Sequence, residues 1–114
     1  MVNQLNILVT GGAGFLGSHL CEKLLENNHK VFCVDNFYSS NKNNIENLIN
    51  HPNFTFLKQD VCKLNIDFSI DQIYNLACPA SPIHYQLDPV KTIQTNILGA
   101  INVLELAKKN NAII

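Results

Sequence analysis

A glycine-rich turn near the start of the chain constrains the fold more than any other feature. Residues 10–17 read TGGAGFLG and contain a GxxGxxG pattern made by Gly11, Gly14 and Gly17. The turn follows the short apolar segment Leu5–Val9, which predicts a strand, and runs into Phe15–Asn27, whose apolar residues recur at helical spacing. A strand, a tight turn and a helix in direct succession begin a βαβ unit, and such units build parallel sheets.

The glycines suit a turn that holds a dinucleotide. In such a turn Gly11 would permit the tight bend, Gly14 would let the backbone approach a pyrophosphate, and Gly17 would let the helix pack closely on the sheet. The helix N-terminus adds free N–H groups and positive potential. Asp35 follows the next predicted strand, about 20 residues further on, where its carboxylate can accept hydrogen bonds from both ribose hydroxyls of an adenosine. A glycine turn without a ligand is the alternative.

The residues after the second predicted strand favour NAD over NADP, and those after the third are candidates for an adenine contact. A carboxylate at Asp35 would repel a 2′-phosphate, and Asn36 stands next to it in place of an arginine. Lys42 is near enough in the sequence to keep NADP as an alternative. Asp60 and Val61 follow the third strand, at the edge where the adenine would lie, and a turn or helix cap is the alternative for Asp60.

The remaining predicted elements alternate between strand and helix. Strands are predicted at 31–34, 54–57 and 72–77, and a short helix around 45–49 with Ser39, Ser40 or Asn41 as its cap. This alternation of apolar strands with helices predicts an α/β fold, a Rossmann-type doubly wound parallel sheet. Residues 112–114 resemble a fifth strand just begun. We therefore expect residues 1–114 to be the N-terminal portion of an NAD-binding domain, truncated there and without a substrate domain.

A long helix is predicted from Pro89 to about Lys109, with Asp88 as its N-cap and the proline at its first position. Its apolar stripe consists of Val90, Ile93, Ile97, Ile101 and Leu104. Leu98 and Leu106 lie outside this stripe, so a second face of the helix is also a candidate for burial.

Composition excludes several classes of protein. The 114 residues are 46% hydrophobic and 15% charged, which is typical of a folded domain. A net charge of −1 and the lack of a basic run argue against a nucleic-acid partner. No apolar run approaches the ~20 residues of a membrane helix, and the first residues lack the pattern of a signal peptide, so we expect a cytoplasmic protein. The 4 cysteines are widely spaced, which favours reduced thiols over a metal site.

Several segments resemble the extended short-chain dehydrogenase/reductases, a family of nucleotide-sugar epimerases, dehydratases and decarboxylases. Besides the glycine turn, the segments that carry the resemblance are Val34–Phe37, Asp71–Pro82, Asp88–Thr92 and Thr95–Asn96. The Pro-Ala-Ser-Pro sequence at 79–82, with Tyr85 after it, resembles the UDP-glucuronate decarboxylase branch of that family. The resemblance extends from Ile7 to Ile114.

The resemblance implies a tightly held NAD⁺ that oxidises UDP-glucuronate at C4. The β-keto acid then loses CO₂, and the reduced cofactor converts the 4-keto pentose into UDP-xylose. A homodimer through helix 88–109 is a further implication. A relative of dTDP-glucose 4,6-dehydratase or of UDP-galactose 4-epimerase is the alternative within the family, and a non-catalytic nucleotide-binding module is the alternative outside it.

The resemblance also implies a set of contacts. The pyrophosphate is assigned to Gly14, Phe15 and Leu16, the adenosine ribose to Asp35, Asn36, Tyr38 and Ser39, and the adenine to Asp60 and Val61. The ribose nearer the nicotinamide is assigned to Leu76 and Cys78, a further cofactor contact to Thr95, and the sugar nucleotide to Tyr85 and Asn102. Two positions depart from the family: Gln94 replaces an expected lysine, and Cys78 replaces the commoner serine.

Catalysis in this family depends on a Tyr-x-x-x-Lys pair in which the lysine lowers the pKa of the tyrosine. Tyr38 and Lys42 have this spacing, but they follow Asp35 directly and would lie at the adenosine end of the cofactor. The catalytic pair must lie beside the nicotinamide, on a helix after the fifth strand. We therefore predict no catalytic residue within these 114 residues.

Overall fold

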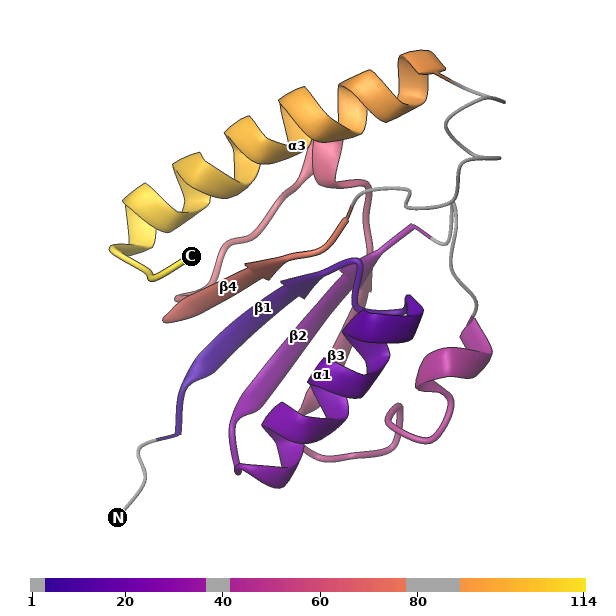
Figure 1. Cartoon of the computed structure of the whole chain (residues 1–114). Coiled ribbons are helices and arrows are strands. Elements are labelled where there is room, and N and C mark those ends of the chain that lie inside the picture. Colours follow the sequence, from indigo (N-terminus) through magenta and orange to yellow (C-terminus); the bar gives the residue numbers. More distant parts are fainter. Residues whose placement is uncertain (1–3, 37–41, 78–88) are drawn as a thin grey trace.

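The computed structural model describes residues 4–36, 42–77 and 89–114 (Figure 1). In chain order its elements are β1 (Asn6–Thr10), α1 (Phe15–Glu26), β2 (Lys30–Asp35), the 3₁₀ helix η1 (Lys42–Ile45), β3 (Phe54–Lys58), the 3₁₀ helix η2 (Val61–Lys63), β4 (Gln72–Asn75) and α3 (Pro89–Asn110). The strands form one parallel sheet in the order β3-β2-β1-β4. This arrangement confirms the predicted α/β fold with a parallel sheet.

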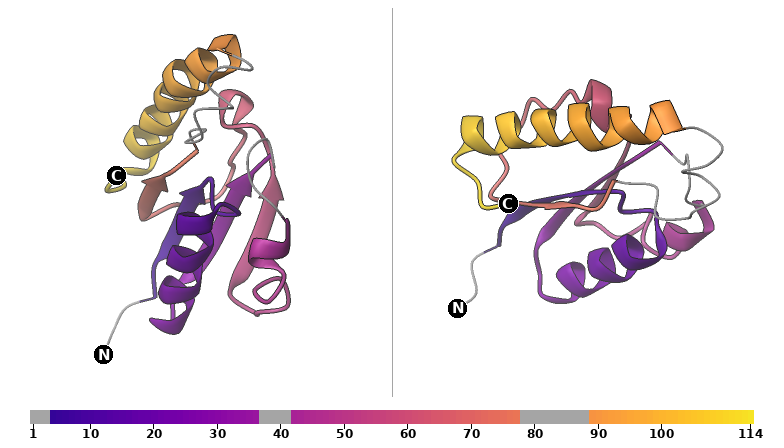
Figure 2. Two further views of the ribbon diagram at one scale, coloured as in Figure 1. Left: turned by 45° about the vertical axis from the view of Figure 1, so that its right-hand side comes forward. Right: turned by 45° about the horizontal axis from the view of Figure 1, so that its top comes forward.

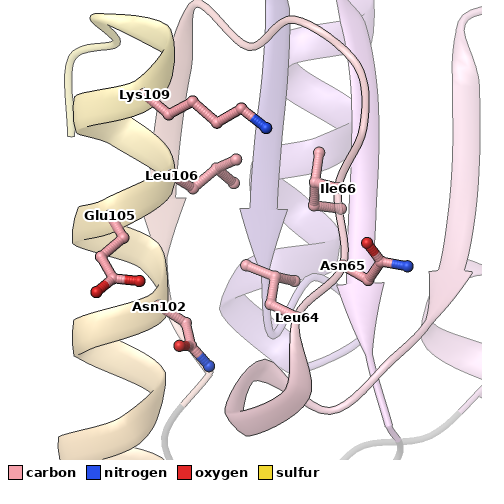
Figure 3. A pocket seen from close by; sticks show the side chains of 7 residues that line it. All are labelled: Leu64, Asn65, Ile66, Asn102, Glu105, Leu106 and Lys109. Carbon is pink, nitrogen blue, oxygen red and sulfur yellow. The ribbon is translucent and has the colours of Figure 1, made fainter.

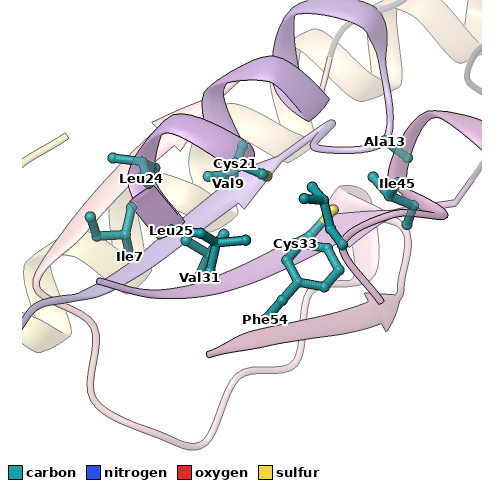
Figure 4. Packing of buried hydrophobic residues seen from close by; sticks show 11 residues of the cluster. Ile7, Val9, Ala13, Cys21, Leu24, Leu25, Val31, Cys33, Ile45 and Phe54 are labelled. Carbon is teal, nitrogen blue, oxygen red and sulfur yellow. The ribbon is translucent and has the colours of Figure 1, made fainter. Parts of the chain in front are cut away.

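Both faces of the sheet are covered, because α1 lies on one face and α3 on the other (Figures 1 and 2). Successive side chains of each strand point to opposite faces, so each face has its own core. Ile7, Val9 and Cys33 pack toward α1 and η1, where Leu24 and Ile45 complete a cluster of buried residues (Figure 4). The opposite face has its own cluster, formed by Leu8, Val34, Val61, Ile66, Ile70, Ile73, Val103, Leu106 and Ala107. The central strand β1 is therefore buried on both sides, as its unbroken apolar sequence predicts.

The chain changes direction across the sheet between β1 and β4. From β1 it moves through α1 to β2 and then to β3 on one side, and it returns to place β4 on the other side of β1. The carboxyl ends of β1 and β4 thus lie side by side at the point where the strand order reverses. Ligands of open α/β sheets bind outside the strands at such a point.

Two elements are shorter than predicted. The helix expected around 45–49 is the 3₁₀ helix Lys42–Ile45, followed by turns, and its proposed caps lie outside the described residues. Asparagine is abundant in this segment and disfavours a continued α-helix, because its side chain competes for backbone hydrogen bonds. The strand expected at 72–77 ends at Asn75, although the Leu76 N–H still donates a hydrogen bond of 3.0 Å to the Thr10 carbonyl of β1.

Helix α3 begins at Pro89, as predicted, and packs on the sheet through its second face. Its side chains at Val103, Leu106 and Ala107 are buried, and so is Gly99. The expected burial is thus confirmed for Leu106 and wrong for Leu98, which is 44% exposed because Gly99 is the residue of that turn that faces inward. The predicted apolar stripe faces away from the sheet, since between 46% and 63% of each side chain is exposed at Val90, Ile93, Ile97, Ile101 and Leu104. None of the described helices is long and apolar enough to cross a bilayer.

The segment after α3 pairs with β4. Ile113 forms a parallel bridge with Gln72, and the Ile113 carbonyl accepts a hydrogen bond of 2.8 Å from the backbone N–H of Ile73. The N–H of Ile113 donates to the Asp71 carbonyl at 3.1 Å. This pairing is an isolated parallel bridge beside β4, at the place where the apolar residues 112–114 predict a fifth strand.

Candidate functional site

The site is built where β1 and β4 end. The Thr10 hydroxyl donates a hydrogen bond to the Asn75 side-chain oxygen and accepts one of 3.1 Å from the Leu76 backbone N–H. Thr10 is fully buried, whereas Asn75 and Leu76 are exposed, so these bonds lie at the border between the core and the solvent. They tie the two strands together at the point where the strand order reverses. Sequence analysis did not assign Thr10 a role.

The glycine turn packs against this junction. Gly11 has φ +70°, and a Cβ there would lie 2.5 Å from the Leu76 carbonyl oxygen. A Cβ on Gly17 would lie 2.3 Å from the Gly11 carbonyl oxygen, so Gly17 brings α1 against the turn itself. At Gly14 a Cβ would meet only the Gly11 oxygen, at 3.3 Å. The backbone at Gly14 is therefore open on its outer side, where a phosphate could approach.

Helix α1 starts at this open position with an unsatisfied N-terminus. Gly14 is its N-cap and supplies no side-chain hydrogen bond, and the first turn contains no acidic residue. The N–H groups of a first helical turn have no partner within the helix, and they carry the positive end of the helix dipole. Phe15 and Leu16 are each 72% exposed, which leaves this end accessible. The geometry and donor set suit a pyrophosphate.

The acid that ends β2 contacts the same turn. Asp35 is buried, and its Oδ2 accepts a hydrogen bond of 3.1 Å from the Ala13 backbone N–H. The Ala13 carbonyl accepts a second bond of 2.8 Å from Nδ2 of Asn44, in η1. The turn is thus held from two sides, by β2 and by η1. Sequence analysis missed Asn44, and its place in an asparagine-rich segment gave no signal to distinguish it.

The segment that follows β3 reaches the same edge of the sheet. Lys58 at the end of β3 pairs with Asp35 in the strand register, and Asp60 and Val61 come next along the chain. The Asp60 carbonyl accepts a hydrogen bond of 2.8 Å from the Lys63 N–H, which closes the 3₁₀ turn η2. Asp35 and the Asp60–Val61 segment are therefore neighbours at the carboxyl edge.

The predicted contact residues divide into three groups. Those that the structure brings to the carboxyl edge are Gly11, Gly14, Phe15, Leu16, Gly17, Asp35, Asn36, Asp60, Val61 and Leu76. Those that lie outside the described residues are Tyr38, Ser39, Cys78 and Tyr85. Thr95 and Asn102 belong to α3. The side chain of Thr95 is not among those that the structure describes. The Asn102 amide donates a hydrogen bond of 2.9 Å to the Val61 carbonyl.

Two cysteines lie beneath the glycine turn. The sulfurs of Cys21 and Cys33 both lie within 3.2 Å of the position that a Cβ on Gly12 would occupy. Both are buried free thiols, and the hydrogen bond with Cys21, together with burial, raises the pKa of the Cys33 thiol. The pair is therefore neutral packing under the turn. Among the described residues, no group of three or more side chains is arranged to bind a metal ion.

A pocket of about 200 Å³ lies on the flank of the molecule, between α3 and the segment that follows η2 (Figure 3). Its lining residues are Leu64, Asn65, Ile66, Asn102, Glu105, Leu106 and Lys109. Asn102 borders both this pocket and Val61, so it is the lining residue that connects the flank with the carboxyl edge.

Comparisons with known proteins agree with this geometry. Residues 8–113 match the model of a family described as GDP-mannose 4,6 dehydratase. UDP-glucuronic acid decarboxylase 1 of Arabidopsis thaliana is 50% identical over 109 residues, which cover 96% of this chain and 25% of that protein. UDP-glucuronic acid decarboxylase 1 of Danio rerio is 49% identical over 106 residues, or 93% of this chain and 25% of that protein. The chain thus spans about a quarter of the length of these curated relatives.

Solved structures show the same arrangement. The Bordetella bronchiseptica enzyme WbmH in complex with NAD⁺ has a TM-score of 0.81 and 32% identity, covering 96% of this chain and 37% of that one. UDP-glucose 4-epimerase from Thermotoga maritima, solved with UDP-glucose, has a TM-score of 0.79 and 33% identity, covering 95% of this chain and 35% of that one. Together with the family match over residues 8–113, these similarities confirm that the chain belongs to the GDP-mannose 4,6 dehydratase family, within the extended short-chain dehydrogenase/reductases.

Proposed function

We propose that this chain is the NAD-binding part of an enzyme that converts UDP-glucuronate into UDP-xylose. The observation that carries the proposal is the glycine turn held beside Asp35 at the reversal point of the sheet. Identity of about half to UDP-glucuronic acid decarboxylases from a plant and a fish supports the choice of reaction. The NAD⁺ complex of WbmH supports the choice of cofactor.

Different residues at the carboxyl edge are assigned to different parts of the cofactor. We propose that the first turn of α1 binds the pyrophosphate through the N–H groups of Phe15 and Leu16, with Gly14 giving access. Asp35 accepts hydrogen bonds from the adenosine ribose, assisted by Asn36, Tyr38 and Ser39. Leu76, Cys78 and Thr95 would contact the part of the cofactor nearer the nicotinamide.

A carboxylate at Asp35 makes this site selective. It is buried and sits against the Ala13 N–H, so a 2′-phosphate placed here would bring like charges together in a poorly hydrated position. NAD is therefore preferred to NADP. Along the same edge, we propose that the Asp60–Val61 segment contacts the adenine through the Asp60 carboxylate, an acceptor, and the Val61 backbone N–H, a donor.

The reaction needs catalytic residues in addition to these cofactor contacts. Bound NAD⁺ supplies the oxidant at C4 of the sugar and the means to reduce the 4-keto pentose again. This chain contributes the binding and orientation of that cofactor. Tyr38 and Lys42 are the chain's Tyr-x-x-x-Lys match and belong to the adenosine end, so we propose that the 114 residues alone do not turn over substrate. Tyr85 would contact the sugar nucleotide.

The outward face of α3 supports a homodimer. Val90, Ile93, Ile97, Ile101 and Leu104 form an apolar stripe along the helix, and each side chain is at least 46% exposed. An apolar surface of this extent favours burial against another protein surface. A second copy of the same helix, packed with its stripe against the first, would bury this apolar face.

Calorimetric titration of the chain with NAD⁺ and NADP⁺ tests the cofactor proposal. Saturable NAD⁺ binding, with weaker NADP⁺ binding, is expected, and the absence of any heat of NAD⁺ binding would overturn it. The reaction is tested by incubating the enzyme that contains this chain with UDP-glucuronate. Release of CO₂ with formation of UDP-xylose is expected. Epimerisation or dehydration of a six-carbon sugar nucleotide, without release of CO₂, would instead identify an epimerase or a dehydratase.

A further inference from the structure

Helix α3 holds the segment that begins at Val61 by two contacts. Nδ2 of Asn102 donates a hydrogen bond of 2.9 Å to the Val61 carbonyl oxygen. One helical turn earlier, a Cβ on Gly99 would lie 2.7 Å from Cγ1 of Val61, so only glycine allows this approach. Val61 itself is 5% exposed. Both the backbone and the side chain of Val61 are therefore fixed by the same face of α3.

This contact lies next to the proposed adenine site. Asp60 precedes Val61 directly, and Lys58, two residues earlier, pairs with Asp35 at the end of the sheet. The peptide that Asn102 holds is the one that follows Val61. That carbonyl and the Val61 side chain together fix the α-carbon of Val61, and the 3₁₀ helix η2, which begins at Val61, restricts its φ. The direction of the Val61 N–H is therefore restricted as well.

We propose that Asn102, packed beside Gly99, is a positioning residue for recognition of the adenine base. It orients the Asp60–Val61 segment so that a carboxylate and a backbone N–H meet the base together. Adenine presents an exocyclic amino donor beside ring-nitrogen acceptors, which is the complementary pattern. The inference depends on the proposed function, and it gives Asn102 a role other than the contact with the sugar nucleotide that the family resemblance implies.

A matched control exists on the same helix. Asn110 also uses its amide on backbone groups: its Oδ1 accepts a bond of 3.2 Å from the Ile70 N–H, and its Nδ2 donates to the Leu106 carbonyl at 3.0 Å. Ile70 lies two residues before β4, at the amino edge of the sheet and away from the proposed cofactor. Replacing Asn110 thus removes a comparable contact of α3 without touching the adenine edge.

The test compares two ligands by calorimetry: NAD⁺ and nicotinamide hypoxanthine dinucleotide, in which a carbonyl replaces the exocyclic amine. For Asn102→Ala we expect the Kd for NAD⁺ to rise roughly three- to tenfold, the effect of losing one hydrogen bond. The Kd for the hypoxanthine dinucleotide should rise less, so the preference for adenine shrinks. Asn110→Ala should leave that preference unchanged.

The outcomes separate the two proposals. No NAD⁺ binding by the unsubstituted chain overturns the proposed function and this inference with it. An equal loss of both ligands in Asn102→Ala, with the adenine preference intact, overturns the inference alone, because a merely structural residue would weaken both alike. Asn102 borders an open pocket, so its truncation leaves no closed cavity and the variant should fold. If circular dichroism shows that Asn102→Ala is unfolded, Asn102→Ser is tested in its place. The ratio of the Kd values for the two dinucleotides then decides in the same way.

Discussion

The Asp35 carboxylate accepts a hydrogen bond of 3.1 Å from the Ala13 backbone N–H, which joins the acid at the end of β2 to the turn that follows β1. The two features that point to a dinucleotide are therefore one unit in space. A substitution in the turn or at Asp35 should therefore affect both, and the first three predictions concern this unit.

Asp35→Asn should weaken NAD⁺ binding by about 10-fold or more, because hydrogen bonds to a charged acceptor contribute about 1.5–3 kcal/mol. NADP⁺ binding should be less affected, since the repulsion of a 2′-phosphate is removed. Calorimetry of both dinucleotides measures the change in preference. Asp71→Asn is the control: its Oδ2 accepts a hydrogen bond of 2.8 Å from the Asn6 N–H at the far end of the sheet. An unchanged NAD⁺/NADP⁺ preference in Asp35→Asn would contradict the assigned role.

Alanine substitutions at Gly14 and Gly11 should affect two different properties, NAD⁺ binding and stability respectively. Gly14→Ala should cost less stability than Gly11→Ala, since its Cβ would meet a single atom, the Gly11 carbonyl oxygen at 3.3 Å. It should nevertheless weaken NAD⁺ binding by obstructing the pyrophosphate. Gly11→Ala should reduce the free energy of unfolding by more than ~1–2 kcal/mol, the cost of the left-handed conformation alone. The added Cβ also meets the Leu76 carbonyl at 2.5 Å. Urea unfolding and calorimetry measure the two properties, and similar losses of stability in both variants would refute the distinction.

Asn44→Ala should lower the free energy of unfolding by about 1 kcal/mol and weaken NAD⁺ binding several-fold, because the Ala13 carbonyl loses its partner. Asn47→Ala, at an exposed position of the same segment, should change neither property. Thermal unfolding with and without NAD⁺ measures both. If Asn44→Ala behaves like Asn47→Ala, η1 does not hold the turn.

Stability should fall at alkaline pH because of Cys33. Its pKa in the folded chain is raised above the usual value of 9.0, through the hydrogen bond with Cys21 and through burial. Above pH 9 the unfolded chain releases the thiol proton and the folded chain retains it, so the free energy of unfolding falls by at most ~1.4 kcal/mol per pH unit. Urea unfolding from pH 8 to 10.5 should show this slope, and Cys33→Ala should flatten it. An equally steep slope in that variant would exclude Cys33 as its source.

The outward stripe of α3 predicts that self-association depends on Ile97 and Ile101. The double substitution Ile97→Gln and Ile101→Gln should make the chain monomeric at concentrations where the unsubstituted chain is dimeric, because an exposed apolar contact is removed. Sedimentation velocity measures the change. Lys108→Gln, at an exposed position of the same helix, should leave the association unchanged. A monomeric unsubstituted chain would contradict the proposed dimer.

Local patterns identified the elements better than the contacts between them. The glycine turn, the apolar strands and the helix start at Pro89 can each be predicted from a few neighbouring residues. The orientation of α3 could not be predicted in the same way, because two of its faces are apolar and only the packing of Gly99 and Val103 selects the inner one.

The amide contacts were harder still to foresee. Asn44 bonds to a residue 31 positions away, and Asn102 to one 41 positions away. Nothing in the local sequence separates these asparagines from their many neighbours of the same type. Their roles emerge only from tertiary distances, and the family resemblance had assigned Asn102 to a different partner.

The bond between Thr10 and Asn75 affects the order in which the sheet assembles. Only α1 separates β1 from β2 along the chain, whereas Thr10 and Asn75 are 65 residues apart. The entropy lost on closing a loop grows with its length, so the β1-α1-β2 unit can form first and β4 is added late. A Thr10→Val substitution should therefore accelerate unfolding and leave the folding rate nearly unchanged. The glycine turn would then be shaped before the strand on its other side is in place.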